Sequence, residues 1–387
     1  MKLSLHHVRL GISTLAAGGL LLVALPAFAN DTPEIDWTIS QNSFSQVVNT
    51  ITENEAEVGD TAFRYAKGNV GLNVASGFGN QQANATYARG DASNCTGCGD
   101  TFTFELADSN QHISGAQIKN SSVDDEGTNP AQVNEDAFRD FRGNAGVNVA
   151  AGNLNQQMNV AALSAKDFAS ADVTLLQAVD SSHYNSNGWD NPTNHAWINK
   201  SDDTSEGVTS FEDNAFQNVQ GNVGVNVAAG NGNQQANVAT VTEGDCGCTH
   251  TATDLDATQR SDGNFSGRLG APDASGENTA QISTTAFQHA VGNVGANVTA
   301  GEFNAQLNVA AISTNDLATS SIDINQSVSN GGYYGSPANE ATLNERAFEH
   351  FTGNAGVNIS AGNSNQQVNV LNATGFGTPV PPVTLGP

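Results

Sequence analysis

The sequence predicts an all-β fold in which repeated units stack as a β-solenoid, compatible with cross-β packing and joined by long polar loops. Three observations predict this class. A motif of 17 residues occurs five times, apolar and polar residues inside it alternate with the strand period of two, and aromatic residues make up only 6% of the chain. Because large side chains are scarce, a narrow repetitive core suits the composition better than a globular one.

The first 29 residues have the layout of a secretory signal peptide. A basic start with Lys2 and Arg9 precedes an apolar stretch at residues 10–25, and a small-residue cleavage site follows at residues 27–29. The apolar stretch is short for a membrane span of about 20 residues, and no later segment approaches one. We expect a mature chain that begins at Asn30, is secreted to the extracellular side or the cell surface, and is not embedded in a membrane.

The charge balance excludes one class of partner. The chain has 39 acidic and 13 basic residues, a formal net charge of −26. Binding to a phosphate backbone needs clustered Lys and Arg, so nucleic acid is not an expected partner. If copies of this acidic chain stack on one another, the repulsion between them falls as their carboxylates are protonated near the ordinary pKa values of about 4. Such self-assembly should therefore be faster in mild acid than at neutral pH.

The motif sets the organisation of the chain. Its five copies occupy residues 68–84, 143–159, 221–237, 292–308 and 353–369. An Ala-Phe pair precedes each copy at a fixed distance, with the aromatic residues Phe63, Phe138, Phe216, Phe287 and Phe348. The leading glycines are 75, 78, 71 and 61 residues apart, so the motif is constant while the connections vary. A cysteine pair follows the first and third copies only, which indicates duplication of a two-copy module.

Each motif copy predicts two short strands joined by a tight turn. In the first copy Val70, Leu72 and Val74 point to one face and the intervening residues to the other, and a turn begins at Gly77. Alternating runs at residues 36–48, 101–106, 172–179 and 322–328 predict a further strand per unit. Stretches rich in Asp, Ser, Asn and Gly, such as residues 182–203, predict exposed loops.

Amide positions stay constant across the five copies, while the apolar positions vary among Val, Ala, Leu and Ile, and we single out three sets of these amides. They are Asn69, Asn144, Asn222, Asn293 and Asn354; Asn73, Asn148, Asn226, Asn297 and Asn358; and Gln82, Gln157, Gln235, Gln306 and Gln367. Identical amides stacked about 4.7–4.8 Å apart can donate to one neighbour and accept from the other, so we predict structural ladders that fix the register. The alternative is that these amides only form turns on solvated strands, which does not explain a constant Gln inside a strand. The constant glycines predict positive φ or close approach between layers.

The string GVNxAAGxxNQQ, present at residues 146–157 and 224–235, resembles the repeat motif of the Fap functional amyloids of pseudomonads, the FapB/FapC family. The resemblance implies stacked Greek-key-like β-layers and a secreted fibre protein of a bacterial biofilm. It also implies export through an outer-membrane pore of a Gram-negative bacterium, and partnership with further copies of itself and with related fibre subunits. Major subunit, nucleator and surface adhesin remain alternative roles.

The four cysteines predict structural disulfides. Cys95 and Cys98 form one pair in the sequence and Cys246 and Cys248 the other, and exported chains usually oxidise their cysteines. The bonds could form within the pairs or between the two equivalent loops. A zinc site that uses His250 is the weaker alternative, because the spacing of the second pair is unusual.

No recurring set of residues predicts an active site, so we expect no enzyme, no catalytic residues, no cofactor and no metal. His289 and His350 occupy the same place after the Ala-Phe pair, but Tyr65, Asp140 and Asn218 occupy it in the other copies. The acidic runs at residues 124–126 and 202–203 are typical of solvated loops.

The predicted division of the chain follows the motif copies. It comprises a signal peptide (1–29), a leader segment (30–59), repeat 1 with a Cys-containing loop (60–130), repeat 2 (131–205), repeat 3 with a Cys-containing loop (206–279), repeat 4 (280–340), repeat 5 (341–374) and a Pro/Gly-rich tail (375–387). Two functions compete. One is a self-assembling structural protein that supports a biofilm matrix and surface adhesion, and the other is a monomeric extracellular β-solenoid adhesin. An adhesin needs polar caps on its terminal layers, whereas a fibre subunit leaves them open.

Overall fold

The computed structural model contains β-strands and turns, and no helix, in the residues that it describes. These are residues 7–14, 34–44, 47–48, 55–59, 61–90, 101–120, 128–133, 136–165, 168–180, 182–186, 193–198, 215–243, 250–268, 277–282, 286–314, 317–329, 332–333, 338–343 and 347–375. Their strands form five sheets, and every strand pair in these sheets is parallel. The all-β stacked repeat fold predicted from the sequence is confirmed.

Five consecutive strands make one layer of the stack, which we call a rung. Rung 1 contains β2 (Glu34–Phe44), β3 (Val47–Val48), β4 (Ala56–Val58), β5 (Lys67–Ser76) and β6 (Gln81–Gly90). Rung 2 contains β7 (Thr101–Ser114), β8 (Gln117–Asn120), β9 (Thr128–Val133), β10 (Arg142–Ala151) and β11 (Gln156–Ala165). Rung 3 contains β12 (Phe168–Asp180), β13 (His183–Ser186), β14 (Thr193–Ile198), β15 (Gln220–Ala229) and β16 (Gln234–Glu243). Rung 4 contains β17 (His250–Asp262), β18 (Phe265–Arg268), β19 (Glu277–Ile282), β20 (Val291–Ala300) and β21 (Ala305–Thr314). Rung 5 contains β22 (Leu317–Ser329), β23 (Gly332–Tyr333), β24 (Ala338–Leu343), β25 (Thr352–Ala361) and β26 (Gln366–Gly375).

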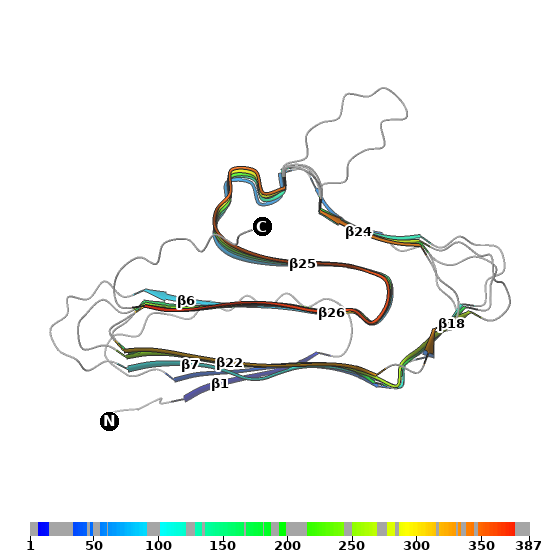
Figure 1. Cartoon of the computed structure of the whole chain (residues 1–387), viewed down its shortest axis with the longest axis horizontal. Coiled ribbons are helices and arrows are strands. Elements are labelled where there is room, and N and C mark those ends of the chain that lie inside the picture. The colour runs from blue at the N-terminus through cyan, green and yellow to red at the C-terminus, as the bar shows by residue number, and fades with distance from the viewer. Residues whose placement is uncertain are drawn as a thin grey trace, which may run out of the picture.

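Each rung follows the same path, so that a view along the stack superimposes the rungs (Figure 1). We number the sheets by the strand that each rung contributes: sheet 1 holds the first strands, and sheet 5 the fifth. Sheet 1 runs along one side, the short strands of sheets 2 and 3 turn the chain back, and the hairpin of sheets 4 and 5 lies inside this arm (Figure 1). Sheet 5 is therefore enclosed between sheets 1 and 4.

The motif copies lie in register above one another. Gly143 pairs with Gly68 and Gly221, Asn148 with Asn73 and Asn226, and the match continues to the ends of the strands. The predicted pair of strands with a tight turn is confirmed in all five copies. The alternating runs at residues 101–106, 172–179 and 322–328 are confirmed as parts of the first strand of a rung, in sheet 1, whereas the run at 36–48 covers β2 of sheet 1 and β3 of sheet 2. The sequence predicted one further strand per unit, and the structure has three.

One sequence prediction was wrong. Residues 182–203, expected as an exposed loop, include β13 and β14, and Ser182, Asn194 and Ala196 are buried. These strands are only four and six residues long and are rich in polar residues, so their pattern is too short to recognise in the sequence. Ala196 of β14 is buried in the core between sheets 3 and 4, together with its paired residues Ala131 and Ala280 of the neighbouring rungs.

Apolar side chains fill the spaces outside the hairpin. One core, between sheets 3 and 4, contains Val147, Val225 and the rings of the Ala-Phe corners. A second core, between sheets 5 and 1, contains Met158 and Leu175. The corner rings form a continuous stack, with centroids 4.8 Å apart for Phe63 and Phe138, 4.9 Å for Phe138 and Phe216, 5.3 Å for Phe216 and Phe287, and 5.0 Å for Phe287 and Phe348. Offset stacking at this spacing adds attraction to the burial of each ring.

Sheet 1 has a sixth strand, β1 (His7–Thr14), outside rung 1. It pairs in parallel with β2, from His7 opposite Glu34 to Thr14 opposite Gln41. β1 lies within the predicted signal peptide, and cleavage before Asn30 stays a prediction. Such cleavage would remove β1 and leave β2 as the edge strand of sheet 1.

Candidate assembly interface: amide columns and the ends of the stack

The three constant amide positions form hydrogen-bonded columns along the stack. In the first column Asn144 donates to Asn69 over 2.9 Å, and the pattern repeats to Asn354 with distances of 2.8 to 3.0 Å. In the second column Asn148 donates to Asn73 over 2.9 Å, and so on to Asn358. Each rung thus donates to the rung before it. The third column runs the other way, because Gln82 donates to Gln157 over 2.7 Å and each Gln donates to the next rung.

The columns lie between the two strands of the hairpin, where both faces are polar. Gln157 and Asn148 are fully buried. The Nε2 of Gln157 also donates to the carbonyl of Val149 across the hairpin, over 2.9 Å. The Nδ2 of Asn159 donates to Oδ1 of Asn148 over 2.8 Å. Hydrogen bonds along and across the stack therefore offset the cost of burying these amides, which is about 1–3 kcal/mol for each unmatched group.

The structure adds four amide columns of four or five members each to the three found in the sequence. Two belong to the motif: Asn84, Asn159, Asn237, Asn308 and Asn369; and Asn80, Asn155, Asn233, Asn304 and Asn365. Two lie outside it: Gln41, Gln111, Gln177, Gln259 and Gln326 in sheet 1; and Asn129, Asn194, Asn278 and Asn339 in sheet 3. The motif alignment already contains the first two, so constancy alone could have found them.

The Gln column of sheet 1 also ties that sheet to the hairpin. Gln41 donates to the carbonyl oxygen of Gln82, and Gln111 to that of Gln157, over 3.1 and 3.2 Å. The same bond recurs in rungs 3, 4 and 5. In every rung, therefore, a hydrogen bond from a Gln side chain of sheet 1 to a backbone carbonyl of sheet 5 joins the two sheets.

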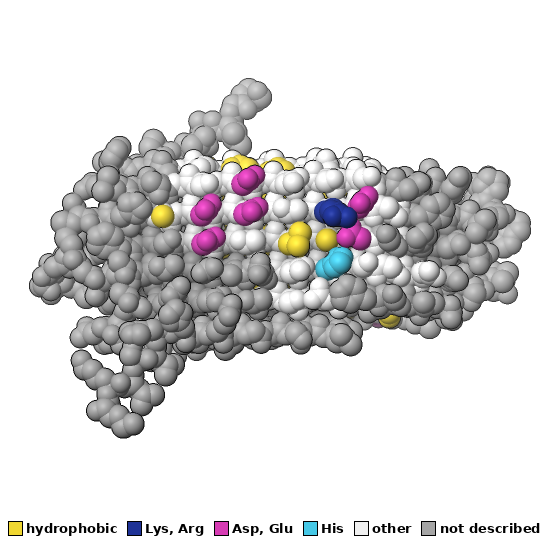
Figure 2. Space-filling view, turned by 90° about the horizontal axis from the view of Figure 1, so that it is seen from below, with side chains coloured by type: hydrophobic (Ala, Val, Ile, Leu, Met, Phe, Trp, Pro, Cys, Tyr) yellow, Lys and Arg dark blue, Asp and Glu magenta, His cyan; other side chains and the backbone are white. Residues whose placement is uncertain are grey.

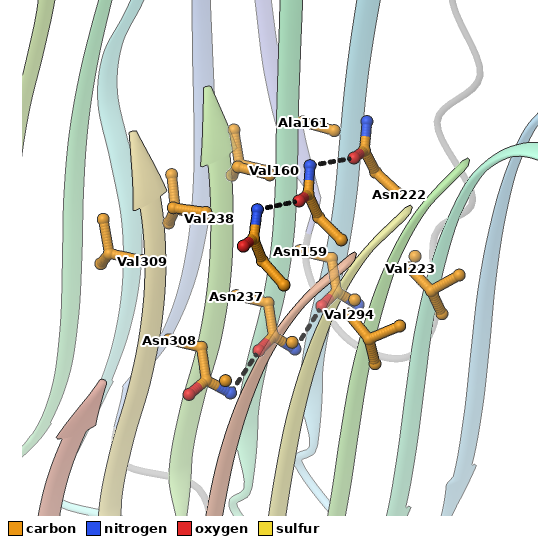
Figure 3. A pocket seen from close by; sticks show the side chains of 18 of the residues that line it. Asn159, Val160, Ala161, Asn222, Val223, Asn237, Val238, Val294, Asn308 and Val309 are labelled. Carbon is orange, nitrogen blue, oxygen red and sulfur yellow. Dashed lines mark hydrogen bonds between the residues drawn. The ribbon is translucent and has the colours of Figure 1, made fainter. Parts of the chain in front are cut away.

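A groove of about 480 Å³ lies near the open mouth of the hairpins, between the first residues of the sheet 4 strands and the middle residues of the sheet 5 strands. Two amide columns line it, including Asn222 on one wall and Asn237 on the other (Figure 3). The Asn159, Asn237 and Asn308 side chains are joined by dashed hydrogen bonds in that view. The groove repeats the same residues in successive rungs and therefore runs along the stacking axis.

Acidic side chains gather on the outer face of sheet 1 (Figure 2). Asp172 pairs with Asp254 in the next rung, and Asp256 pairs with Asp323. Burial raises the pKa of Asp172 above its ordinary value of 3.8, and the charges of Asp254 and Asp256 raise it further. Because the folded state then binds the proton more tightly, the stack gains stability as pH falls through this raised pKa and loses it as pH rises.

We therefore expect the double variant Asp254→Asn, Asp256→Asn to weaken the pH dependence of assembly. Removing both charges lowers repulsion at neutral pH, so the variant should assemble faster than wild type at pH 7 and gain less on acidification. Growth rates from about pH 7 to pH 4 at fixed salt measure this. An unchanged pH profile would show that this acidic group does not control assembly.

The remaining sequence candidates are the cysteines and the histidines. Cys95, Cys98, Cys246 and Cys248 lie outside the described residues, so the disulfides stay a prediction. His289 and His350 stack on each other with ring centroids 4.7 Å apart. In the part of the chain that the structure describes, no group of three His, Cys, Asp or Glu side chains could hold a metal ion. The same part contains no helix long and apolar enough to cross a membrane.

The sequence of the chain is similar to those of known proteins. The model of the functional amyloid protein FapB/FapC family matches residues 26–165, 106–302 and 190–374, overlapping segments that together cover most of the chain. The functional amyloid subunit FapC of Pseudomonas aeruginosa is 41% identical over 126 residues, which are 31% of this chain and 32% of that protein. The match thus spans about a third of the length of that relative. No solved structure matches the chain. The family match over most of its length shows that the chain belongs to the FapB/FapC family of functional amyloid proteins.

Proposed function

We propose that the chain is a self-assembling subunit of an extracellular fibre, in which rung 5 of one copy docks on rung 1 of the next. One observation carries this proposal. Oε1 of Gln82, at the start of the Gln column, is buried and has no hydrogen-bond partner in the described residues. In every other rung the equivalent oxygen accepts from the Gln of the preceding rung. The Gln367 amide of a preceding copy would supply the missing donor.

The other features of the two ends support the same docking. The outer edges of β5 and β6 at one end, and of β25 and β26 at the other, have no further strand in the described part of the chain. Val368 and Val370 in rung 5 are 39% and 51% exposed. Their counterparts in rung 1 are the small residues Ala83 and Ala85, by the register of sheet 5. Docking would bury two valines above two alanines, which favours association.

A monomeric adhesin is the alternative, and the open ends disfavour it. Exposed strand edges pair with other chains unless charges, prolines or a covering segment block them. In the described residues β1 covers rung 1 in sheet 1 only, and its removal with the signal peptide would open that edge too. A stack with open, matching ends is suited to polymerisation.

The setting of the fibre is inferred from the signal peptide and from the relative. FapC of Pseudomonas aeruginosa is a functional amyloid subunit. We infer that this chain is exported after cleavage before Asn30, passes an outer-membrane pore and joins a biofilm matrix at the cell surface with related subunits.

The test is fibre growth by the purified chain without residues 1–29. We expect electron microscopy to show unbranched fibres, and diffraction to show strands spaced about 4.7–4.8 Å along the fibre axis. A chain that stays a soluble monomer across the range of pH and salt would contradict the proposal and leave the adhesin as the better account.

A further inference from the structure

The side chain after each corner Phe changes in charge from one end of the stack to the other. The five residues are Arg64, Arg139, Gln217, Gln288 and Glu349. Rungs 1 and 2 thus present cations, rungs 3 and 4 neutral amides, and rung 5 a carboxylate. The constant amide columns show no such gradient, so this column distinguishes the two ends of the chain.

Neighbouring side chains in this column contact each other. Nε2 of Gln217 donates to Oε1 of Gln288, and Nε2 of Gln288 donates to Oε2 of Glu349, each over 2.9 Å. A side chain at this position therefore reaches its counterpart one rung away. The residue that follows Glu349 across a junction would be Arg64 of the next copy.

The backbone at the corner places these residues in line. The amide N–H of Asp140 donates to the carbonyl of Gln217, that of Asn218 to Gln288, and that of His289 to Glu349, over 2.9 to 3.0 Å. Continued across a junction, the same pattern directs the N–H of His350 to the carbonyl of Arg64 in the next copy. The docking that completes the Gln column thus also brings Glu349 above Arg64.

The surroundings of Arg64 suit a second carboxylate. Its Nη1 lies 3.0 Å from Oδ2 of Asp136, but that oxygen also lies 3.3 Å from Nη1 of Arg139. Two guanidinium groups therefore share one carboxylate oxygen. Nε of Arg64 is buried and finds no hydrogen-bond partner in the described residues. Lys67 adds a further cation nearby in the sequence, in a chain whose net charge is −26.

We propose that Glu349 of one copy forms an ion pair with Arg64 of the next copy, and that this pair selects docking of rung 5 on rung 1. The inference rests on the proposed fibre function, and it names the residues that determine the polarity of the junction. Charged groups at an interface act mainly on the association rate and on which partner is accepted. The pair therefore should control the growth rate more than the final stability of the fibre.

The test uses two single charge reversals, Glu349→Arg and Arg64→Glu. Either variant alone places like charges at every junction, whereas alternating copies of the two place opposite charges at every junction. We expect each variant alone to elongate on the order of tenfold more slowly than wild type, and an equimolar mixture to grow at close to the wild-type rate. At 1 M salt, where the screening length falls to about 3 Å, the single variants should approach wild type.

Each outcome decides the proposal. A mixture that grows no faster than its separate components, with wild type still forming fibres, would overturn the ion pair and leave the fibre function standing. Failure of wild type to form fibres would instead contradict the proposed function.

The Arg64→Glu variant also places a carboxylate opposite Asp136, so circular dichroism checks its fold. If that fold is lost, salt rescue of Glu349→Arg decides, since a growth defect that 1 M salt does not relieve is not electrostatic. Arg346→Gln, which removes a cation three residues before Glu349 in the sequence, is the control and should leave growth unchanged.

Discussion

The double variant Gln157→Ala, Gln235→Ala is expected to abolish or strongly slow fibre growth. It removes two neighbouring members of the Gln column, with their bonds to each other, to Gln82 and to Gln306. The bonds to the carbonyls of Val149 and Val227 are lost as well. The donor of Gln82 loses its acceptor along the column, and the oxygen of Gln306 loses its donor, in a fully buried place.

The size of this effect follows from the burial of the groups left behind. Each net hydrogen bond contributes about 0.5–1.5 kcal/mol, and each buried unmatched partner costs about 1–3 kcal/mol. The sum rivals the whole stability of a typical domain, about 5–15 kcal/mol, and it recurs in every copy along a fibre.

A matched control removes polar side chains from two neighbouring rungs without opening the interior. Thr258 and Asn325 pair in sheet 1 on its outer face, next to Gln259 and Gln326, which face inward. Thr258→Ala with Asn325→Ala should grow fibres at nearly the wild-type rate. Dye-monitored growth of both double variants beside wild type measures the difference. Equal growth of the two would mean that the amide columns do not hold the stack.

The second large effect is expected from Gly221→Ala. Gly221 has φ of +136°, and a Cβ there would lie 1.9 Å from the carbonyl oxygen of Gly143 in the rung before. The oxygen belongs to the backbone and cannot move aside without separating the rungs. Strain at this φ alone costs on the order of 1–3 kcal/mol, so the total should exceed about 3 kcal/mol and prevent regular stacking.

Gly59→Ala serves as the control for the same chemical change. A Cβ at Gly59 meets its nearest neighbour, Oε1 of Glu57, at an ordinary 3.5 Å, and φ there lies outside the left-handed region. This variant should keep the β-content and the growth rate of wild type. Circular dichroism and fibre yield after dilution from denaturant compare the two. A Gly221→Ala chain that folds and assembles normally would show that the rungs do not approach as closely as described.

The motif made most of the stack predictable from the sequence. Residues equivalent to Asn69, Asn73 and Gln82 recur without change, and the structure places each set in one column. Both predicted reasons for constant glycines, positive φ and close approach between layers, are found in the structure. Gly221 has positive φ, whereas Gly224 has an ordinary φ and lies where a Cβ would meet the Asn159 amide at 2.7 Å. The residues that are constant across the five copies are thus those whose replacement would leave a buried hydrogen-bonding group unmatched or cause a steric clash.

The parts that the sequence did not reveal lie outside the motif. The Gln column of sheet 1 is separated from the motif Gln by 41, 46, 58, 47 and 41 residues in the five rungs. Because the connections differ in length, no fixed spacing marks it. Strands β13 and β14 were missed because they are only four and six residues long and rich in polar residues, although Ala196 packs in the core between sheets 3 and 4. The sequence did not reveal that Oε1 of Gln82 lacks a donor, because this follows from the position of Gln82 as the first residue of its column in the structure.

The mass per unit length of wild-type fibres tests the central claim that one chain supplies five successive rungs. The chain has a mass of 39.9 kDa. Five rungs about 4.7–4.8 Å apart occupy about 24 Å, so each protofilament should weigh about 1.7 kDa per Å, slightly less after signal removal. Scanning transmission electron microscopy of unstained fibres gives this value, with the protofilament number counted in cross-section. A value of about 8 kDa per Å, one chain per strand spacing, would contradict the five-rung stack.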